Sequence, residues 1–276
     1  MKRFFQKVVC FSSIILLFAS CGEYNKILKT TDLIQRFEYA QKYFEMGKYG
    51  RTVALLEDVV KMTRTTAMGE ESLYLLAQSH YKMKDYTTAS EFFKMYFTQY
   101  PRGEYAELAR FYSAYGLYLD SPDARLDQSD TFKSMQQFQD FLELYPQSER
   151  KEEAQNALFE LQEKLALKEL YSARLYYNLG DYSIIPFPGV NYFSCVITAQ
   201  NAIRTYPFTK YREEFLYYVF KSKYEMAVRS VEEKKELRYR DVVDEFYSYA
   251  NEFPEGKYLK ELRKMYESID KELKKQ

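Results

Sequence analysis

An aromatic residue followed by proline recurs four times in the chain, each time with a small residue two positions after the proline. The four copies are Tyr100-Pro101-Arg102-Gly103, Tyr145-Pro146-Gln147-Ser148, Tyr206-Pro207-Phe208-Thr209 and Phe253-Pro254-Glu255-Gly256. Because proline lacks an N–H and restricts the residue before it, each copy ends the helix-periodic apolar stretch that precedes it. The 276 residues include only 9 glycines and 7 prolines, a composition that suits packed helices. The chain is therefore predicted to be an all-α repeat protein.

The segment from Glu70 to Gly103 gives the clearest repeat unit. Apolar and small residues recur at helical spacing on both sides of the short turn Lys84-Asp85-Tyr86, with Ala77 before the turn and Ala89 after it. Small residues at these positions let two helix axes approach closely. This length and these positions resemble the tetratricopeptide repeat, a pair of antiparallel helices with a period of about 34 residues.

The same template predicts a solenoid of about five helix pairs that ends in a C-terminal capping helix. Polar insertions interrupt the third pair at 120–130 and the fourth at 183–191, and a charged turn around 229–238 interrupts the fifth. A long stretch rich in Glu and Lys lacks turn residues and is predicted to connect two groups of repeats. The expected organisation is a signal peptide at 1–20, a lipidated tether at 21–31, repeats one to three at 32–148, the connecting helix at 149–168, and repeats four and five with the cap at 169–276.

The first twenty residues read as a secretory signal. Lys2, Arg3 and Lys7 precede an apolar run at 8–18, which is too short to span a bilayer. The sequence Phe18-Ala19-Ser20-Cys21 resembles the lipobox at which bacteria attach a lipid to a cysteine thiol before cleavage. We therefore predict lipidation of Cys21. The alternative is an ordinary secretory signal in which this cysteine is incidental.

The residue types that carry catalysis or metal binding are scarce. Lys and Arg together number 40, as do Asp and Glu, so no net field attracts nucleic acid. His80 is the only histidine, and Cys195 is the only cysteine beyond Cys10 and Cys21. One histidine and one distant thiol are too few for a zinc site or a Cys–His pair. We predict that the protein is not an enzyme and holds no metal or cofactor.

Aromatic and amide side chains stand at the exposed positions predicted for the first helices of the repeats. In repeats of this type those helices line a concave surface, where rings could hold apolar side chains of an extended peptide and amides could bind its backbone. For each aromatic ring, packing between helices is the alternative role. The predicted peptide-binding groove comprises Phe37, Gln41, Phe44, Tyr74, Gln78, Tyr81, Tyr105, Tyr112 and Tyr115.

Taken together, the lipobox, the five repeats, the aromatic-Pro endings and Asp127-Gln128 within the third-repeat insertion resemble the BamD family of outer-membrane assembly lipoproteins. The resemblance implies a scaffold that receives unfolded outer-membrane proteins and docks on the periplasmic domains of a BamA-type barrel protein. It implies attachment to the outer membrane by the lipid, facing the periplasm, with no nucleic-acid partner. The insertion at 183–191 departs from the family pattern.

Two other functions fit a lipid-anchored helical repeat. One is a periplasmic repeat adaptor that coordinates envelope construction. The other is a lipoprotein that captures glycans for uptake, although the chain has no Trp for a sugar-stacking platform. Co-purification with a barrel protein would separate the assembly role from the adaptor role, and binding of an aromatic-ended barrel-protein peptide to the groove would separate both from the uptake role.

Overall fold

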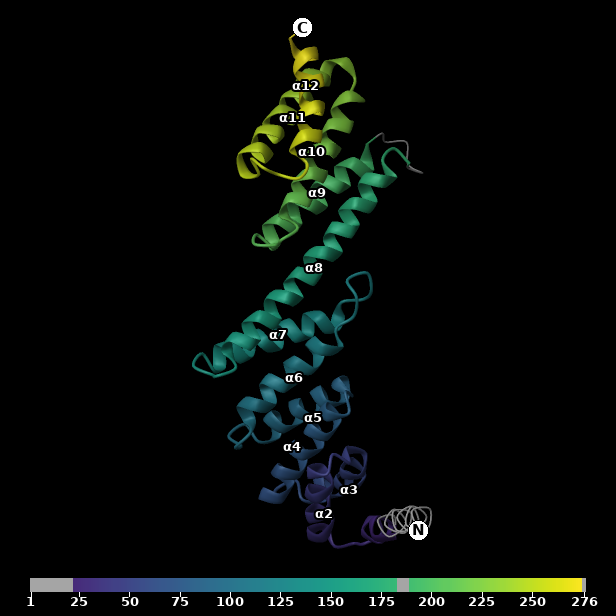
Figure 1. Ribbon diagram of the computed structural model, residues 1–276, viewed down its shortest axis with the longest axis vertical. Coiled ribbons are helices and arrows are strands. Elements are labelled where there is room, and N and C mark those ends of the chain that lie inside the picture. Colours follow the sequence, from purple (N-terminus) through teal and green to yellow (C-terminus); the bar gives the residue numbers. More distant parts are fainter. Residues whose placement is uncertain (1–21, 183–188, 275–276) are drawn as a thin grey trace, which may run out of the picture. The chain divides into compact units, whose positions relative to one another are not determined.

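The computed structural model describes residues 22–182 and 189–274, a part of the chain that is helical almost throughout and contains no strand (Figure 1). The predicted signal peptide, Cys21 and most of the insertion at 183–191 lie outside the described residues. A helical segment over 22–28 comes first. The helices that follow are α2 (Leu33–Glu45), α3 (Tyr49–Met62), α4 (Ala67–Lys82), α5 (Tyr86–Gln99), α6 (Ala106–Asp120), α7 (Ser129–Leu144), α8 (Lys151–Leu179), α9 (Val190–Thr205), α10 (Arg212–Val228), α11 (Glu232–Glu252) and α12 (Leu259–Leu273).

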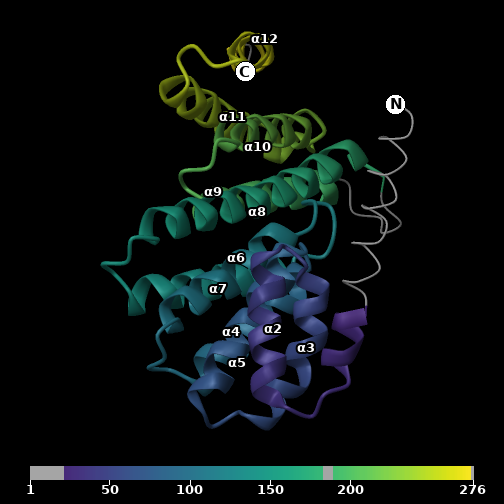
Figure 2. The ribbon, with the colours of Figure 1, turned by 60° about the horizontal axis from the view of Figure 1, so that its bottom comes forward.

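The helices form the predicted pairs. Helices α2 to α7 each pack on the next one along the chain, and so do α9 to α12 (Figures 1 and 2). Alanines such as Ala40, Ala77, Ala89 and Ala199 are fully buried where helices meet, which permits close approach of the axes. The prediction of an all-α fold built from tetratricopeptide-like helix pairs with a capping helix is confirmed.

The chain divides into two compact units. The first contains the described residues up to Ser121 and Ser129–Leu158, and the second contains Pro122–Gln128 and the chain from Phe159 onward. Helix α8 contributes to both. The stretch predicted as a connecting helix, 149–168, runs without a break into the first helix of the fourth repeat, because no Gly or Pro occurs between Lys151 and Leu179.

The third-repeat insertion is an ordered loop of the second unit. Gln128 is buried, and its Nε2 atom donates hydrogen bonds to the carbonyl oxygens of Asp123 (2.8 Å) and Leu126 (3.1 Å). The guanidinium of Arg125 lies 4.7 Å from the ring centre of Tyr171 on α8. Gln128 thus holds the loop in shape from within, and Arg125 packs the loop against α8.

The charged segment of the fifth repeat is mostly helical, contrary to the expected turn at 229–238. Helix α11 already begins at Glu232, so the turn is confined to Arg229–Val231. Glu232 and Glu233 stand in the first turn of α11, where acidic side chains complement the helix dipole. Further along, Arg240 pairs with Glu236 at 2.5 Å. Charge alone therefore does not mark a turn here.

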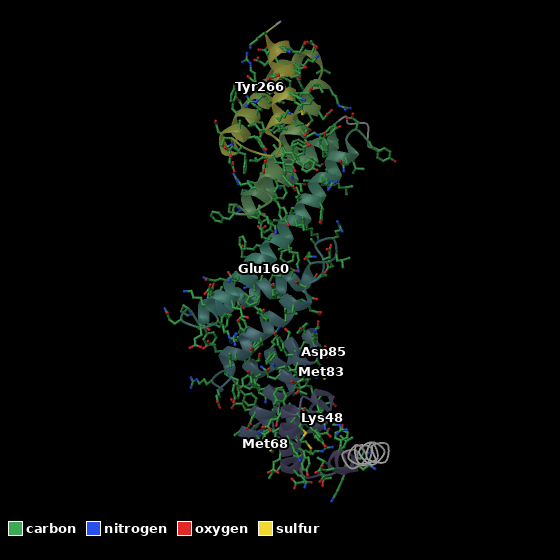
Figure 3. All side chains as sticks on the ribbon, viewed as in Figure 1. Lys48, Met68, Met83, Asp85, Glu160 and Tyr266 are labelled. Atoms are coloured by element: carbon green, nitrogen blue, oxygen red, sulfur yellow. The ribbon has the colours of Figure 1, made fainter. Side chains whose placement is uncertain are left out.

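The turns within the first, second and fourth pairs share a left-handed residue. Gly47, Lys84 and Gly180 have φ angles of 70°, 64° and 54° at the ends of α2, α4 and α8. A left-handed residue after the last helical turn is a common way to end a helix, and glycine adopts it at the lowest cost. Met83 and Asp85, the neighbours of Lys84, are labelled in Figure 3.

The aromatic-Pro turns are held by a carboxylate from the first helix of the same repeat. In the second repeat, the hydroxyl of Tyr96 donates to Glu70 Oε1 (2.7 Å), and the backbone N–H of Glu104 donates to the same oxygen (3.0 Å). A Cβ on Gly103 would lie 2.7 Å from the Tyr96 hydroxyl and would also overlap the Glu70 carboxylate. The small residue after proline is therefore required by this arrangement, which we term the closing contact.

The fifth repeat contains the same arrangement. Tyr249 donates to Glu213 Oε1 at 2.6 Å, and a Cβ on Gly256 would lie 2.6 Å from the Tyr249 hydroxyl. The third repeat has Phe141 in place of the tyrosine, and the hydroxyl of Ser148 donates to Glu107 Oε1 at 2.5 Å instead. Glycine thus accompanies tyrosine, whereas serine accompanies phenylalanine.

Candidate peptide-binding surface

One face of α4 carries three of the predicted groove residues. Tyr74, Gln78 and Tyr81 are four and three positions apart, a spacing that places them on one side of a helix. The adjacent side packs Leu73 and Ala77 into a core cluster with residues of α5 and α6, and Tyr74 and Tyr81 pack against the same cluster. Gln78 Nε2 donates to the hydroxyl oxygen of Tyr74 at 3.0 Å, so the amide and the phenol are held together.

Rings from α6 and its N-terminus meet those of α4. Tyr105 stacks on Tyr74 with ring centres 4.1 Å apart and planes 11° apart, and Tyr112 meets Tyr81 edge to face at 5.1 Å. Phe93 of α5 is fully buried beneath them and stacks on Tyr112 at 5.5 Å. We call these five rings the aromatic array. Its four tyrosines are half-buried, so part of each ring is accessible.

The phenols of Tyr74 and Tyr81 remain protonated in neutral solution. Burial raises the pKa of Tyr74 to about 12, and it raises the pKa of Tyr81 to about 12 as well. A protonated phenol can donate a hydrogen bond to a carbonyl oxygen. The array therefore presents apolar ring faces beside neutral hydrogen-bond donors, a combination that suits a peptide.

A cation at the edge of the array was not anticipated from the sequence. The guanidinium of Arg150 lies 5.4 Å from the ring centre of Phe111 and 5.9 Å from that of Tyr112. It also forms an ion pair with Glu153 at 2.7 Å. Arg150 follows α7 and reaches Tyr112 of α6 only through the folding of the third repeat. The one local signal is its place just after an aromatic-Pro turn.

The remaining predicted residues lie around the array or apart from it. Tyr115 stacks on Phe111 at 5.2 Å. Gln41 Nε2 donates to Glu71 Oε1 at 2.7 Å and so links α2 to α4. Phe44 contacts Tyr49 within the first repeat at 5.3 Å. The structure brings Tyr74, Gln78, Tyr81, Tyr105 and Tyr112 together, whereas Gln41 and Phe44 belong to the first repeat.

Phe37 was expected at an exposed groove position and is instead in the core. Its side chain is 9% exposed, and it packs in the cluster that includes Ala40, Tyr43 and Leu56. Phe37, Ala40 and Tyr43 recur every three positions and are all buried, so they define the inward face of α2. The expected groove therefore loses Phe37.

The histidine and the remaining cysteine occupy structural positions. His80 Nδ1 lies 2.8 Å from Asp85 Oδ2, and its ring stacks on Phe92 at 5.2 Å. Cys195 is buried, and burial raises the pKa of its thiol. Across residues 22–182 and 189–274, no three His, Cys, Asp or Glu side chains lie where they could hold a metal ion together.

A family model described as outer membrane lipoprotein, YfiO, matches residues 30–185, which is more than half of the chain. The chain belongs to this family. The YfiO match contains the whole aromatic array, whereas α9 to α12 lie beyond it. None of the described helices is both long and apolar enough to span a bilayer. No curated protein matches the chain.

Proposed function

We propose that this YfiO-family protein is a lipid-anchored scaffold of the outer-membrane β-barrel assembly machinery. The aromatic array would receive extended segments of unfolded outer-membrane proteins. The observation that carries this proposal is the continuous set of rings from α4, α5 and α6, which lies entirely within the residues matched by the family. Apolar side chains of an unfolded segment would pack on the accessible ring surface, and its carbonyls would accept from the phenols.

The lipid and the second unit complete the proposed role. A lipid on Cys21 would confine the protein to the outer membrane and face it toward the periplasm. That confinement raises the effective concentration near membrane partners, so each contact can be individually weak. The second unit would dock on the periplasmic domains of a BamA-type barrel protein. We propose no catalysis, no cofactor and no nucleic-acid partner.

Purification of the barrel protein from native membranes tests the assembly role. A tag on the barrel protein should retain this chain through washes at moderate salt, together with other components of the machinery. Membranes that carry an unrelated tagged outer-membrane protein serve as the control. If the chain is absent from the barrel-protein complex while the rest of the machinery is recovered, the assembly role is wrong.

Peptide binding tests the array itself. The probe is a fluorescent peptide from a barrel strand that ends in an aromatic residue, and anisotropy gives its affinity for the full-length chain in detergent. Tyr81→Ala removes a ring that contacts Tyr112 and Phe93, so we expect at least tenfold weaker binding. Tyr81→Phe keeps the ring and should retain most of the affinity.

A matched control lies outside the array. Tyr39 of α2 is also half-buried, and its aromatic contact is with Tyr43. Tyr39→Ala should leave peptide affinity unchanged. Equal affinities of Tyr81→Ala and the unaltered protein would place the binding site elsewhere.

A further inference from the structure

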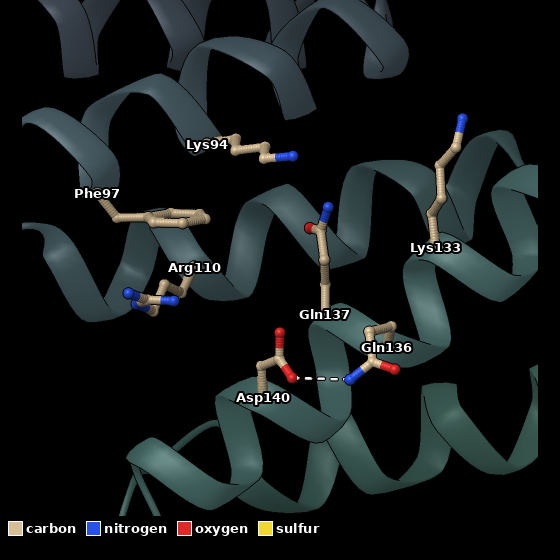
Figure 4. Close-up of a pocket in the computed structure, with 7 residues that line it drawn as sticks. All are labelled: Lys94, Phe97, Arg110, Lys133, Gln136, Gln137 and Asp140. Carbon is tan, nitrogen blue, oxygen red and sulfur yellow. Dashed lines mark hydrogen bonds between the residues drawn. The ribbon is translucent and has the colours of Figure 1, made fainter.

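A pocket of the first unit lies across α5, α6 and α7, and its lining side chains are separate from the aromatic array. Its volume is about 300 Å³. Figure 4 shows the side chains around this space, with Lys94 and Gln137 reaching toward one another. The lining residues are Lys94 and Phe97 of α5, Arg110 of α6, and Lys133, Gln136, Gln137 and Asp140 of α7.

Positive charge in this pocket is only partly neutralised. Arg110 lies 4.2 Å from the ring centre of Phe97, which holds the guanidinium in place. Neither Lys94 nor Arg110 forms an ion pair with any residue that the structure describes. Asp140 is the acidic residue of the lining, and it accepts from Gln136 Nε2 at 2.8 Å.

Gln137 places a second, independent requirement on a ligand, which must offer a hydrogen-bond donor. Its Oε1 atom is buried and has no hydrogen-bond partner among the described residues. A buried acceptor without a donor is destabilising, and few such atoms occur in folded proteins. A ligand that suits this pocket therefore offers a negative charge to Lys94 and Arg110 and an N–H to Gln137.

We propose that this pocket binds an acidic segment of a partner protein. A carboxylate of the segment lies between Lys94 and Arg110, and a backbone N–H beside it donates to Gln137 Oε1. The aliphatic part of the acidic side chain packs on the Phe97 edge. An acidic peptide supplies the charge and the donor within one residue, which favours it over a simple anion. This site goes beyond the proposed function because none of its residues belongs to the array.

Fluorescence anisotropy of the full-length chain in detergent tests the proposal. The probe is a labelled eight-residue peptide with two central aspartates, and the comparison peptide has asparagines at the same positions. We expect measurable binding of the aspartate peptide, and at least tenfold weaker binding of the asparagine peptide. Raising the salt concentration from 50 to 300 mM should markedly weaken binding of the aspartate peptide, because the contact is ionic.

Variants locate the binding in the pocket. Lys94→Met and Arg110→Met each remove one cation, and each should lower the affinity for the aspartate peptide at least fivefold. Gln137→Leu keeps a side chain of similar volume but removes the hydrogen-bond acceptor, so it should also lower the affinity for the aspartate peptide. Lys82→Met changes an exposed lysine of α4 by the same chemistry and should have no effect. Circular dichroism of each variant confirms folding.

Three outcomes would overturn the proposal. One is equal affinity for the two peptides, which would remove the role of the carboxylate. Another is unchanged affinity in both Lys94→Met and Arg110→Met. The third is equally effective competition by inorganic phosphate at the same concentration, which would mean a simple anion site. None of these outcomes bears on the array, which the Tyr81 variants test separately.

Discussion

At the scale of single residues, Lys84 holds a conformation that favours glycine. Its φ angle is 64°, and the equivalent positions of the first and fourth repeats are Gly47 and Gly180. A side chain in the left-handed region crowds its own backbone. The Lys84→Gly variant relieves this crowding, although glycine also makes the unfolded chain more flexible.

We expect Lys84→Gly to raise the free energy of unfolding by about 0.5–1 kcal/mol. Urea unfolding followed by circular dichroism measures the change. The control is Lys82→Gly, within the last turn of α4, which should lower stability by up to ~1 kcal/mol because glycine is a poor helix former. A lower urea midpoint for Lys84→Gly would contradict the expected relief.

The tyrosines of the array make stability depend on pH under alkaline conditions. Burial raises the pKa of Tyr74 and Tyr81 to about 12, above the ordinary value of 10.0. Below pH 10 these phenols are protonated in both the folded and the unfolded chain, so their contribution is fully present. Between pH 10 and 12 the unfolded chain loses these protons and the folded chain keeps them, so stability falls as pH rises.

The measurement is the urea midpoint at intervals from pH 8 to 12, with absorbance at 295 nm to follow phenol ionisation. A variant with both Tyr74→Phe and Tyr81→Phe should show a shallower fall above pH 10 than the unaltered protein. An identical slope in the two proteins would show that these two phenols do not carry the effect.

At the scale of elements, the closing contact explains the small residue in the aromatic-Pro turn. A Cβ at position 103 would overlap the Glu70 carboxylate and lie 2.7 Å from the Tyr96 hydroxyl. Gly103→Ala should therefore lower stability by about 1–3 kcal/mol, through overpacking and a disturbed buried hydrogen bond. Thermal unfolding followed by circular dichroism measures the loss.

Gly50 provides the matched control for this substitution. It lies in the first turn of α3, and a Cβ there would meet nothing within 4 Å. Gly50→Ala should leave stability unchanged or raise it by up to ~1 kcal/mol, since alanine favours helix. If the two alanine variants melt at the same temperature, the crowding at Gly103 is not energetically important.

Helix ends and helix faces could be predicted where they depend on residues that are close in the sequence. Helix ends at the aromatic-Pro turns were predictable because proline acts on its own neighbours. The face of α4 that carries Tyr74, Gln78 and Tyr81 was predictable from helical spacing. The inward placement of Phe37 was missed because aromatic residues stand on both faces of α2.

Features that depend on distant segments could not be found in the same way. The carboxylate that closes the second repeat, Glu70, is 33 positions before Gly103, and no local pattern connects the two. Arg150 likewise reaches Tyr112 only in the folded repeat. The lack of turn residues predicted an extended helix at 149–168, and helix α8 continues beyond that stretch to Leu179 because the sequence up to Leu179 also lacks Gly and Pro.

At the scale of the whole molecule, the proposed lipid on Cys21 would decide where the protein resides. Cys21→Ser removes the thiol to which the lipid would be attached. We expect the altered protein to move from the membrane pellet to the soluble periplasmic fraction, because none of the described helices is long and apolar enough to span a bilayer. Mass spectrometry of the N-terminal peptide should show acyl chains on the unaltered protein. Retention of Cys21→Ser in salt-washed membranes would contradict the predicted anchor.

The closing contacts also determine where a repeat tolerates added length. In the third repeat, Ser148 and Glu107 join the turn after α7 to the start of α6, while the insertion enters between the other ends of these two helices. Residues added between the end of α6 and the start of α7 leave the hydrogen bond between Ser148 and Glu107 undisturbed. A reporter peptide or affinity tag could therefore be grafted beside Gly47 or Lys84, whereas one extra residue in Tyr100-Pro101-Arg102-Gly103 would misalign every repeat that follows.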